Sequence, residues 1–413
     1  MEYLFRFREE NVIKVLKEVN IVDVEASTLI EGQAIVIENG RIVDVTRSPV
    51  GGEAISFRGA FLCPGLVDAH VHLVWEGQPD PNSFSLRESV AMTAYRAARS
   101  AWRNLEGGVT TVRDVGGPHG ISIALAEAIE QGISQGARVL AAGSPVVQTG
   151  GHVYSISEEA DGPDEVRKAV RRQIKAGAHL IKLMCSGGAY TRGESIHATQ
   201  LTPAEIRAAV EEAKAAERRV AAHALPEQAI QNALEAGVTT VEHAALLSKR
   251  NLDAFCTTGA FMVPTLAPYY LMATRGREMG VPDYAVVKSE QVMEHYPTSL
   301  QMAFAAGVRI ALGTDAGSPG IPHPTVPFEA WLWQSLANIP APAILRAATL
   351  GAAEAVGLEQ EIGRIQQGYW ADFVVYRSNP LEDITVLHHP EAIFQRGAQV
   401  AGGGTVWSKT LLG

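Results

Sequence analysis

The sequence predicts an α/β fold, a distorted (β/α)8 TIM barrel joined to a small composite β-sandwich domain that is built from both chain ends. Two observations predict it. The middle of the chain repeats a helix-like stretch, a glycine and a short β-branched run, as at 106–112, 176–183, 236–241 and 306–311. Both ends instead carry short apolar runs separated by turn residues. A chain of 413 residues can bury one large core beside a smaller one.

The small domain is expected to comprise residues 1–62 and 356–413. Residues 33–45 indicate two strands joined at Asn39-Gly40, a strong hairpin signal. The tail has similar short runs at 372–376, 392–394 and 398–401. Head and tail should therefore pair into one β domain that the barrel, at residues 63–355, interrupts.

The repeating middle predicts eight barrel strands, near 69–74, 109–114, 138–143, 179–185, 219–223, 239–243, 261–265 and 309–314. Glycine after a helix supplies a left-handed residue, and Val, Ile and Thr runs suit buried parallel strands. Thr202, Pro203 and Glu205 form a capping box with proline at N1, which predicts a helix start. In such barrels the active site lies at the C-terminal strand ends.

Composition narrows the class of protein. The formal net charge is −10 and there is no basic block, which argues against nucleic acid as a partner. Three scattered cysteines, Cys63, Cys185 and Cys256, favour a reducing compartment. The first ten residues carry charges where a signal peptide needs an apolar core, and no apolar run reaches membrane-spanning length. We therefore expect a cytoplasmic enzyme with a small-molecule substrate and no membrane partner. It could form a homo-oligomer, but nothing in the sequence specifies a symmetry.

Six chemistry-bearing residues lie at or just past the C-terminal part of expected strands one, four, five, six and eight: His70, His72, Lys182, His223, His243 and Asp315. His70 and His72 are two residues apart on a strand, so both rings point to one face. Several imidazoles with a carboxylate form a site suited to zinc or a similar divalent metal.

Lys182 needs its own explanation, because an ammonium cannot ligate a metal and is costly to bury beside cations. It could be a neutral amine with a depressed pKa. Alternatively, its amine has reacted with carbon dioxide to give a carbamate that bridges two metals. The second interpretation suits these neighbours better, because it turns a repelled cation into an anionic ligand.

These residues carry a resemblance to a known family. The segment Pro-Gly-Leu-Val-Asp-Ala-His-Val-His at 64–72, with Lys182, His223, His243 and Gly-Thr-Asp-Ala at 313–316, resembles the amidohydrolase superfamily in its binuclear, carboxylated-lysine branch. Residues 148–152, 186–188 and 313–317 resemble the imidazolonepropionase-related metal-dependent hydrolases, which include Xaa-Pro dipeptidases, carboxypeptidases and ochratoxin amidohydrolase. The resemblance covers nearly the whole chain.

The resemblance implies two divalent metal ions, expected to be zinc. His70, His72 and Asp315 would hold one ion, and His223 and His243 the other, with carboxylated Lys182 as the bridge. His152 would sit beside the substrate carbonyl and donate a hydrogen bond to the developing oxyanion. A bridging hydroxide would cleave a C–N bond of an N-acyl amino acid or a dipeptide such as Xaa-Pro, with Asp315 as the proton shuttle.

The sequence departs from the peptidase pattern after strand five. Peptidase members carry a Tyr two residues after the strand-five His, where its hydroxyl helps to hold the substrate carboxylate. The residue here is Leu225, which cannot make that hydrogen bond. Arg192 or Tyr190 would then recognise the carboxylate, or the substrate lacks one. His323, downstream of Asp315, is a further candidate for lining the pocket.

Three alternatives remain open. Leu225 favours an enzyme that hydrolyses carbamates, phenylureas or similar xenobiotics. A mononuclear imidazolonepropionase- or deaminase-type enzyme is the second, but deaminases usually place His-x-x-Glu on strand five. Here Glu227 follows His223 by four residues, and Lys182 would have no role. A non-catalytic protein of the same fold would be expected to lose ligands, and none is missing.

Overall fold

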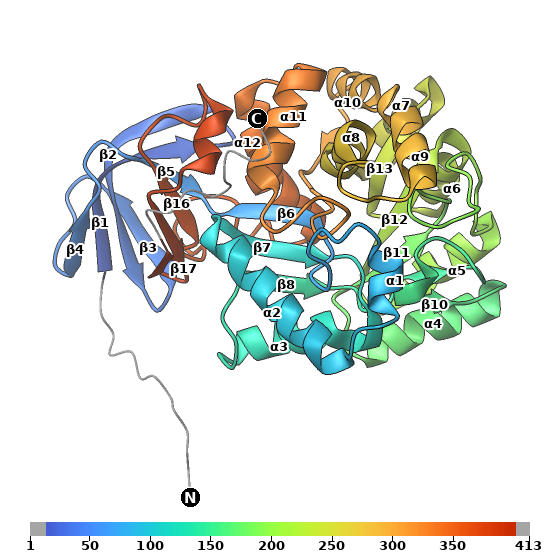
Figure 1. The fold of residues 1–413 in the computed structure, drawn as a ribbon. Coiled ribbons are helices and arrows are strands. Elements are labelled where there is room, and N and C mark those ends of the chain that lie inside the picture. Colours follow the sequence, from blue (N-terminus) through green and yellow to red (C-terminus); the bar gives the residue numbers. More distant parts are fainter. Residues whose placement is uncertain (1–13, 402–413) are drawn as a thin grey trace, which may run out of the picture.

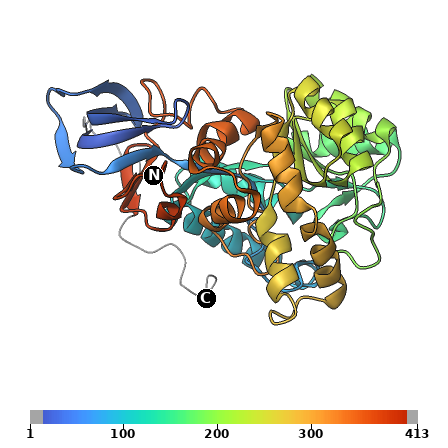
Figure 2. The same cartoon turned by 90° about the horizontal axis from the view of Figure 1, so that it is seen from above.

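The computed structural model describes residues 14–401. Residues 1–13 and 402–413, which the predicted small domain includes, lie outside the described residues. Figure 1 shows a β-rich part beside a larger body in which helices surround strands, and Figure 2 shows the same separation from above.

The small domain is an eight-stranded sheet to which both ends of the chain contribute. Its strand order is β18-β17-β16-β5-β1-β2-β3, and β4 pairs with β1. The strands are β1 (Lys14–Asp23), β2 (Thr28–Glu38), β3 (Arg41–Thr46), β4 (Glu53–Ser56), β5 (Phe61–Pro64), β16 (Phe373–Tyr376), β17 (Ala392–Gln395) and β18 (Ala398–Ala401). Head meets tail where β5 and β16 run antiparallel, with Cys63 opposite Val374. Head and tail thus share one sheet, while the exact domain bounds stay a prediction.

The hairpin predicted at Asn39-Gly40 joins β2 to β3. Both residues have left-handed backbone, with φ of 51° and 76°. Two successive positive φ values belong to the type I′ turn, whose twist matches that of paired strands.

The barrel strands lie in two parallel sheets. The first holds β6 (Leu66–Val71), β7 (Val109–Asp114) and β8 (Arg138–Ala141). The second holds β9 (Val146–Val147), β10 (Glu158–Glu159), β11 (Leu180–Met184), β12 (Arg219–Pro226), β13 (Thr240–Leu246), β14 (Phe261–Val263) and β15 (Arg309–Ile310). Strands one and eight close the ring through the Val71–Ala316 bridge and a 3.0 Å hydrogen bond from Ala69 N to Leu312 O. The predicted fold class, a distorted (β/α)8 barrel with a β domain, is confirmed.

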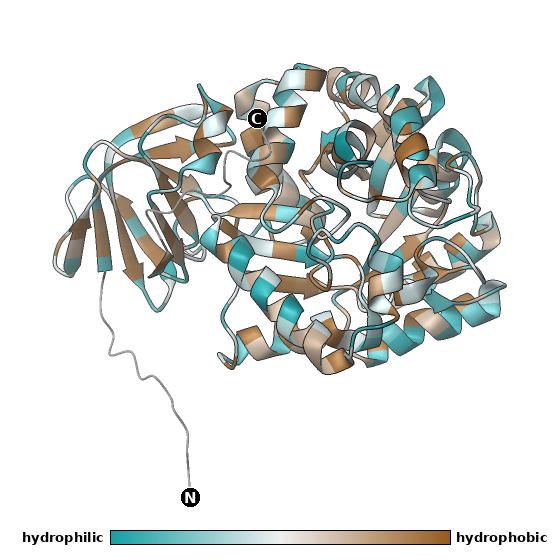
Figure 3. Ribbon diagram, viewed as in Figure 1, coloured by the Kyte–Doolittle hydropathy of each residue, from teal (hydrophilic) through white to brown (hydrophobic). Residues whose placement is uncertain are grey.

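Helices surround the barrel strands in Figures 1 and 2, and Figure 3 shows the strands as mostly hydrophobic, whereas many outer helices carry hydrophilic stretches. The predicted capping box is present, with Thr202 and Glu205 bonding each other's backbone at the start of α5. The helices are α1 (Pro81–Ser85), α2 (Val90–Glu106), α3 (Ile121–Glu130), α4 (Pro163–Lys175), α5 (Pro203–Ala215), α6 (Glu227–Ala236), α7 (Lys249–Thr258), α8 (Leu266–Arg275), α9 (Asp283–Met293), α10 (Tyr296–Ala305), α11 (Val326–Ala337), α12 (Ala341–Arg346) and α13 (Ala352–Val356). Short 3-10 turns lie at Pro118–Gly120, Tyr154–Ile156 and Ile384–His388, and a π turn at Ala347–Gly351. Across residues 14–401, no helix is both long enough and apolar enough to cross a membrane.

Candidate metal centre

All six predicted ligands line one small cavity at the C-terminal ends of the barrel strands. Its volume is about 20 Å³, and its walls are His70, His72, Trp75, His152, Val153, Lys182, Met184, Tyr190, His223, His243, Tyr269 and Asp315. The six predicted ligands are all buried. The barrel therefore brings together residues that are up to 245 positions apart in the chain.

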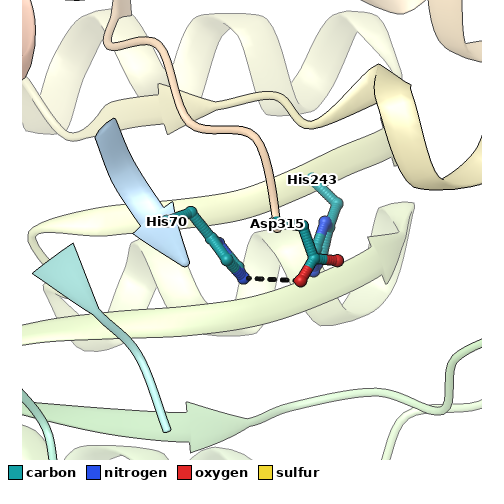
Figure 4. Close-up of side chains that lie close together, drawn as sticks. All are labelled: His70, His243 and Asp315. Carbon is teal, nitrogen blue, oxygen red and sulfur yellow. Dashed lines mark ion pairs between the residues drawn. The ribbon is translucent and has the colours of Figure 1, made fainter. Parts of the chain in front are cut away.

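The closest cluster within the cavity is made by His70, His243 and Asp315, whose ligand atoms lie within 4.8 Å of one another (Figure 4). The Oδ1 of Asp315 lies 3.6 Å from Nε2 of His70 and 3.5 Å from Nε2 of His72. The rings of His223 and His243 have centroids 4.6 Å apart. These spacings allow the side chains to share metal ions between them.

Each of the four histidines uses one ring nitrogen for a protein hydrogen bond, which leaves the other free for a ligand. The free nitrogens are Nε2 of His70, His72 and His243, and Nδ1 of His223. Nδ1 of His70 bonds Glu242 Oε2 at 2.7 Å, and Nδ1 of His72 bonds Gly116 O at 2.8 Å. Nε2 of His223 bonds Gly187 O at 3.3 Å, and Nδ1 of His243 bonds Thr265 Oγ1 at 2.8 Å. Metal-binding histidines are oriented in this way, because the bonded N–H fixes the ring and its tautomer.

Burial sets the charge of these histidines. It lowers the pKa of His72 to about 3 and holds the pKa values of His70, His223 and His243 well below the usual value. The four rings are therefore neutral near pH 7, which is the form that binds metals. Burial also raises the pKa of Asp315 to about 7, and Ser318 Oγ donates a 2.8 Å hydrogen bond to its Oδ1.

Lys182 lies on β11 with 1% exposure. Burial lowers the pKa of its amine to about 8, and within residues 14–401 the amine makes no hydrogen bond to another group. A buried amine without a hydrogen-bond partner, close to Glu242 and Asp315, fits a group that is completed by a further ligand or by modification. The donor set as a whole therefore fits divalent metal ions.

A buried network behind the cavity supports His70 and was not foreseen from the sequence. Glu242 accepts hydrogen bonds from His70 Nδ1, from Arg113 Nη2 at 2.9 Å and from Thr240 Oγ1. Arg113 also donates to Ala69 O at 2.5 Å and to Thr240 Oγ1 at 2.9 Å. Strand alternation does not predict this role, because it would place Glu242 and the neighbouring His243 on opposite faces of β13.

A second unforeseen network holds strand one against strand eight. Asp68 accepts hydrogen bonds from the backbone N–H groups of His70, at 3.1 Å, and of Thr314, at 3.0 Å. The Thr314 hydroxyl donates to the same carboxylate at 2.6 Å. Asp68 therefore fixes the segment that carries Asp315 relative to the one that carries His70.

The predicted substrate-binding residues divide into two groups. His152 and Tyr190 line the cavity, and the His152 ring stacks on that of His223 with centroids 4.4 Å apart. Arg192, Leu225 and His323 do not line it. Arg192 is exposed, and Leu225 is buried with its N–H bonded to Ser186 Oγ at 3.1 Å.

His323 is turned away from the cavity. Its Nδ1 lies 3.0 Å from Asn104 Nδ2, and its Nε2 lies 3.3 Å from His72 O and 3.2 Å from Trp75 O. It therefore supports the backbone after β6. Among the described residues that line the cavity, Lys182 is the sole lysine or arginine.

Comparison with known proteins gives consistent matches along most of the chain. A family described as "Amidohydrolase family" matches residues 61–397. Ochratoxinase from Aspergillus niger is 31% identical over 428 aligned positions, covering 94% of this chain and 87% of that protein. A prolidase solved with N-methylphosphonate-L-proline has a TM-score of 0.87 at 34% identity, covering 95% of this chain and 100% of that one. A Xaa-Pro dipeptidase with bound methionine has a TM-score of 0.88 at 28% identity, covering 94% and 100%.

Proposed function

The chain belongs to the amidohydrolase family, and on that basis we propose that it is a binuclear metal-dependent hydrolase that cleaves a C–N bond in a peptide-like amide. The observation that carries the proposal is the cavity itself. Four neutral histidines, each with one free ring nitrogen, meet Asp315 and the unbonded amine of Lys182 there.

Two groups of residues would hold the metals. His70, His72 and Asp315 would bind one ion and His223 and His243 the other, with Lys182 as a carbamate formed with carbon dioxide between them. Zinc suits this nitrogen and oxygen donor set. When bound, two such ions supply hydroxide at neutral pH and polarise the scissile carbonyl.

The remaining chemistry falls to the chain's own side chains. Asp315 would accept the proton of the attacking water and pass it to the leaving nitrogen. Oδ1 of Asp315 accepts a hydrogen bond from the Ser318 hydroxyl, so Oδ2 would be the oxygen that carries the proton. His152 lines the cavity and would place a ring nitrogen beside the substrate carbonyl oxygen.

The substrate class we favour is an N-acyl amino acid or a dipeptide such as Xaa-Pro. It is supported by the likeness to a prolidase, a Xaa-Pro dipeptidase and ochratoxinase. One observation favours a second class, the carbamates and phenylureas. Leu225 cannot bind a carboxylate, and Arg192 and His323 do not line the cavity.

Metal analysis and one hydrolysis screen test the proposal. We expect about two divalent ions per purified chain, and hydrolysis of at least one member of a panel of N-acyl amino acids and Xaa-Pro dipeptides. The panel should include aryl carbamates and phenylureas. One ion per chain with full activity would favour the mononuclear alternative, for which His70, His243 and Asp315 could form the site. Activity confined to carbamates or ureas would overturn the peptide-like substrate.

A further inference from the structure

Glu194 is a buried carboxylate beside the cavity to which the proposed reaction gives no role. Its side chain is 8% exposed and accepts three hydrogen bonds. Oε2 accepts from His152 Nδ1 at 2.9 Å and from Gly188 N at 3.2 Å, while Oε1 accepts from Gln200 Nε2 at 2.7 Å. Gln200 in turn accepts from the backbone N–H of His152 at 3.0 Å. Glu194 and Gln200 therefore hold the ring and the backbone of His152 together.

The His152 ring is also confined by its packing. It stacks on His223 with centroids 4.4 Å apart and planes at 27°, and it lies nearly parallel to the Tyr190 ring at 6.2 Å. A Cβ placed on Gly188 would lie 2.1 Å from Cε1 of His152, so the ring packs directly against that glycine. With Nδ1 bonded to Glu194, Nε2 is the ring nitrogen left for a ligand in the cavity.

Glu194 remains ionised despite its burial. Desolvation alone would raise the pKa of this carboxyl, but His152 and the hydrogen bonds from Gln200 and Gly188 hold it below its usual value. A buried carboxylate is costly to retain unless its neighbours satisfy it. Here the neighbours that satisfy it are those that orient His152.

We propose that Glu194 is a positioning residue for amide hydrolysis, which holds the imidazole of His152 with Nε2 directed at the carbonyl oxygen of the bound substrate. This inference rests on the proposed function. An ionised carboxylate that accepts a hydrogen bond from Nδ1 fixes the ring orientation and stabilises the doubly protonated ring, in which Nε2 also carries a proton to donate to the carbonyl oxygen.

A purely structural role is the competing explanation, since Glu194 also closes the loop that follows β11. That loop has anchors that do not pass through Glu194. Lys288 Nζ donates to Gly188 O at 3.2 Å and to Thr191 O at 2.9 Å, and the Tyr284 hydroxyl donates to Tyr190 O at 2.9 Å. The loop should therefore keep its place when Glu194 loses its charge.

The test is a double-mutant cycle in the metal-loaded full chain, using Glu194→Gln and His152→Ala. Glutamine offers one acceptor where Glu194 offers two, so His152 Nδ1 and Gln200 Nε2 compete for it. We expect Glu194→Gln to lower kcat about 10- to 100-fold with metal content unchanged and KM within about threefold. In the His152→Ala background the same substitution should change kcat less than about threefold, because the ring that Glu194 would position is absent.

Asp161→Asn is the matched control. Asp161 belongs to the same region as His152, is exposed, and accepts hydrogen bonds from Thr149 rather than from His152. Its substitution should leave kcat within about twofold of the wild type. If Glu194→Gln lowers kcat by the same factor in the wild-type and His152→Ala backgrounds, Glu194 serves only the loop structure. If the single variant Glu194→Gln keeps the wild-type kcat, Glu194 has no role in the reaction.

A readout independent of turnover separates this inference from the proposed function. Imidazole ¹⁵N spectra, with His152 assigned by its loss in His152→Ala, should show a protonated Nδ1 in the wild type and in Asp161→Asn. Glu194→Gln should alter that signal. A wild type without the Nδ1 proton, or an unchanged signal in Glu194→Gln, would overturn the positioning role. A wild type inactive on every substrate in the panel would instead overturn the proposed function.

Discussion

Replacing Glu242 by Gln should destabilise the barrel and weaken metal binding together. Both carboxylate oxygens lie 2.9 Å from Arg113 Nη2, and Oε2 also accepts from His70 Nδ1. Glutamine has one oxygen and one NH2 group. Whichever way its amide turns, the NH2 group faces the Arg113 guanidinium, which is also a donor.

The size of the effect follows from burial. The side chains of Arg113 and Glu242 are 3% and 0% exposed. Removing one partner of a buried pair costs about 3–5 kcal/mol, because the remaining charge stays buried. Arg113 keeps its bonds to Ala69 O and Thr240, so we expect a loss of about 3 kcal/mol, a large part of a stability of about 5–15 kcal/mol. Metal affinity should fall about 10- to 100-fold, because His70 loses the group that orients it.

Urea unfolding of the metal-free proteins gives the free energy of unfolding, and titration against a chromophoric chelator gives the metal affinity. Glu235→Gln is the control, because Glu235 pairs with Arg250 at 3.0 Å with both side chains 56% exposed, and exposed ion pairs contribute little to stability. A Glu242→Gln protein within about 1 kcal/mol of the wild type, with unchanged metal affinity, would refute the reasoning.

Three further predictions concern the cavity. Asp315→Asn should abolish turnover while metal content falls only in part, since the amide keeps an oxygen ligand but cannot carry a proton; comparable kcat would assign proton transfer to another group. Lys182→Ala should lose most activity and regain some with added short carboxylates or bicarbonate, whereas Lys182→Arg should not be rescued because the guanidinium fills the space and stays charged; a fully active alanine variant would exclude the carbamate bridge. Substrate analogues with an esterified carboxylate should retain most of their kcat/KM, because Leu225 cannot bind a carboxylate; a loss above about tenfold, matched by the same loss in Arg192→Ala, would show that Arg192 reaches the substrate.

The barrel, and the meeting of the six candidate ligands in one cavity, were predictable because two periodic signals coincide. Buried parallel strands follow helix-ending glycines, and the chemistry-bearing residues lie where those strands end. His70 and His72 illustrate this, since His70 lies on β6, His72 follows directly after its end, and both rings enter the cavity. The local sequence therefore predicts both the barrel strand and the direction in which its histidine side chains point.

Glu242 shows where that reasoning stops. Alternation along β13 would place Glu242 and His243 on opposite faces, yet both approach the His70 ring. The backbone turns left-handed at His243 and Ala244, with φ of 68° and 50°, and the alternation ends there. Positive φ at residues other than glycine is uncommon and is held by the surrounding fold, so it has no local sequence signal.

The loop residues illustrate a second limit. Arg192 and His323 were assigned to the pocket by their nearness in sequence to Lys182 and Asp315. A loop can direct successive side chains to solvent, to the cavity or to neighbouring backbone. Its hydrogen bonds decide among these, as those of His323 with Asn104 and the His72 and Trp75 carbonyls do.

The strand order of the small domain has a consequence for synthesis on the ribosome. β5 lies between β1 and β16, but β16 is made about 310 residues later. At roughly 5–20 residues per second, the nascent chain carries β5 with one unpaired edge for roughly 15–60 s. Such an edge can pair with another unfinished chain. Crowded polysomes should therefore promote aggregation through this sheet, even though the barrel holds most of the buried core.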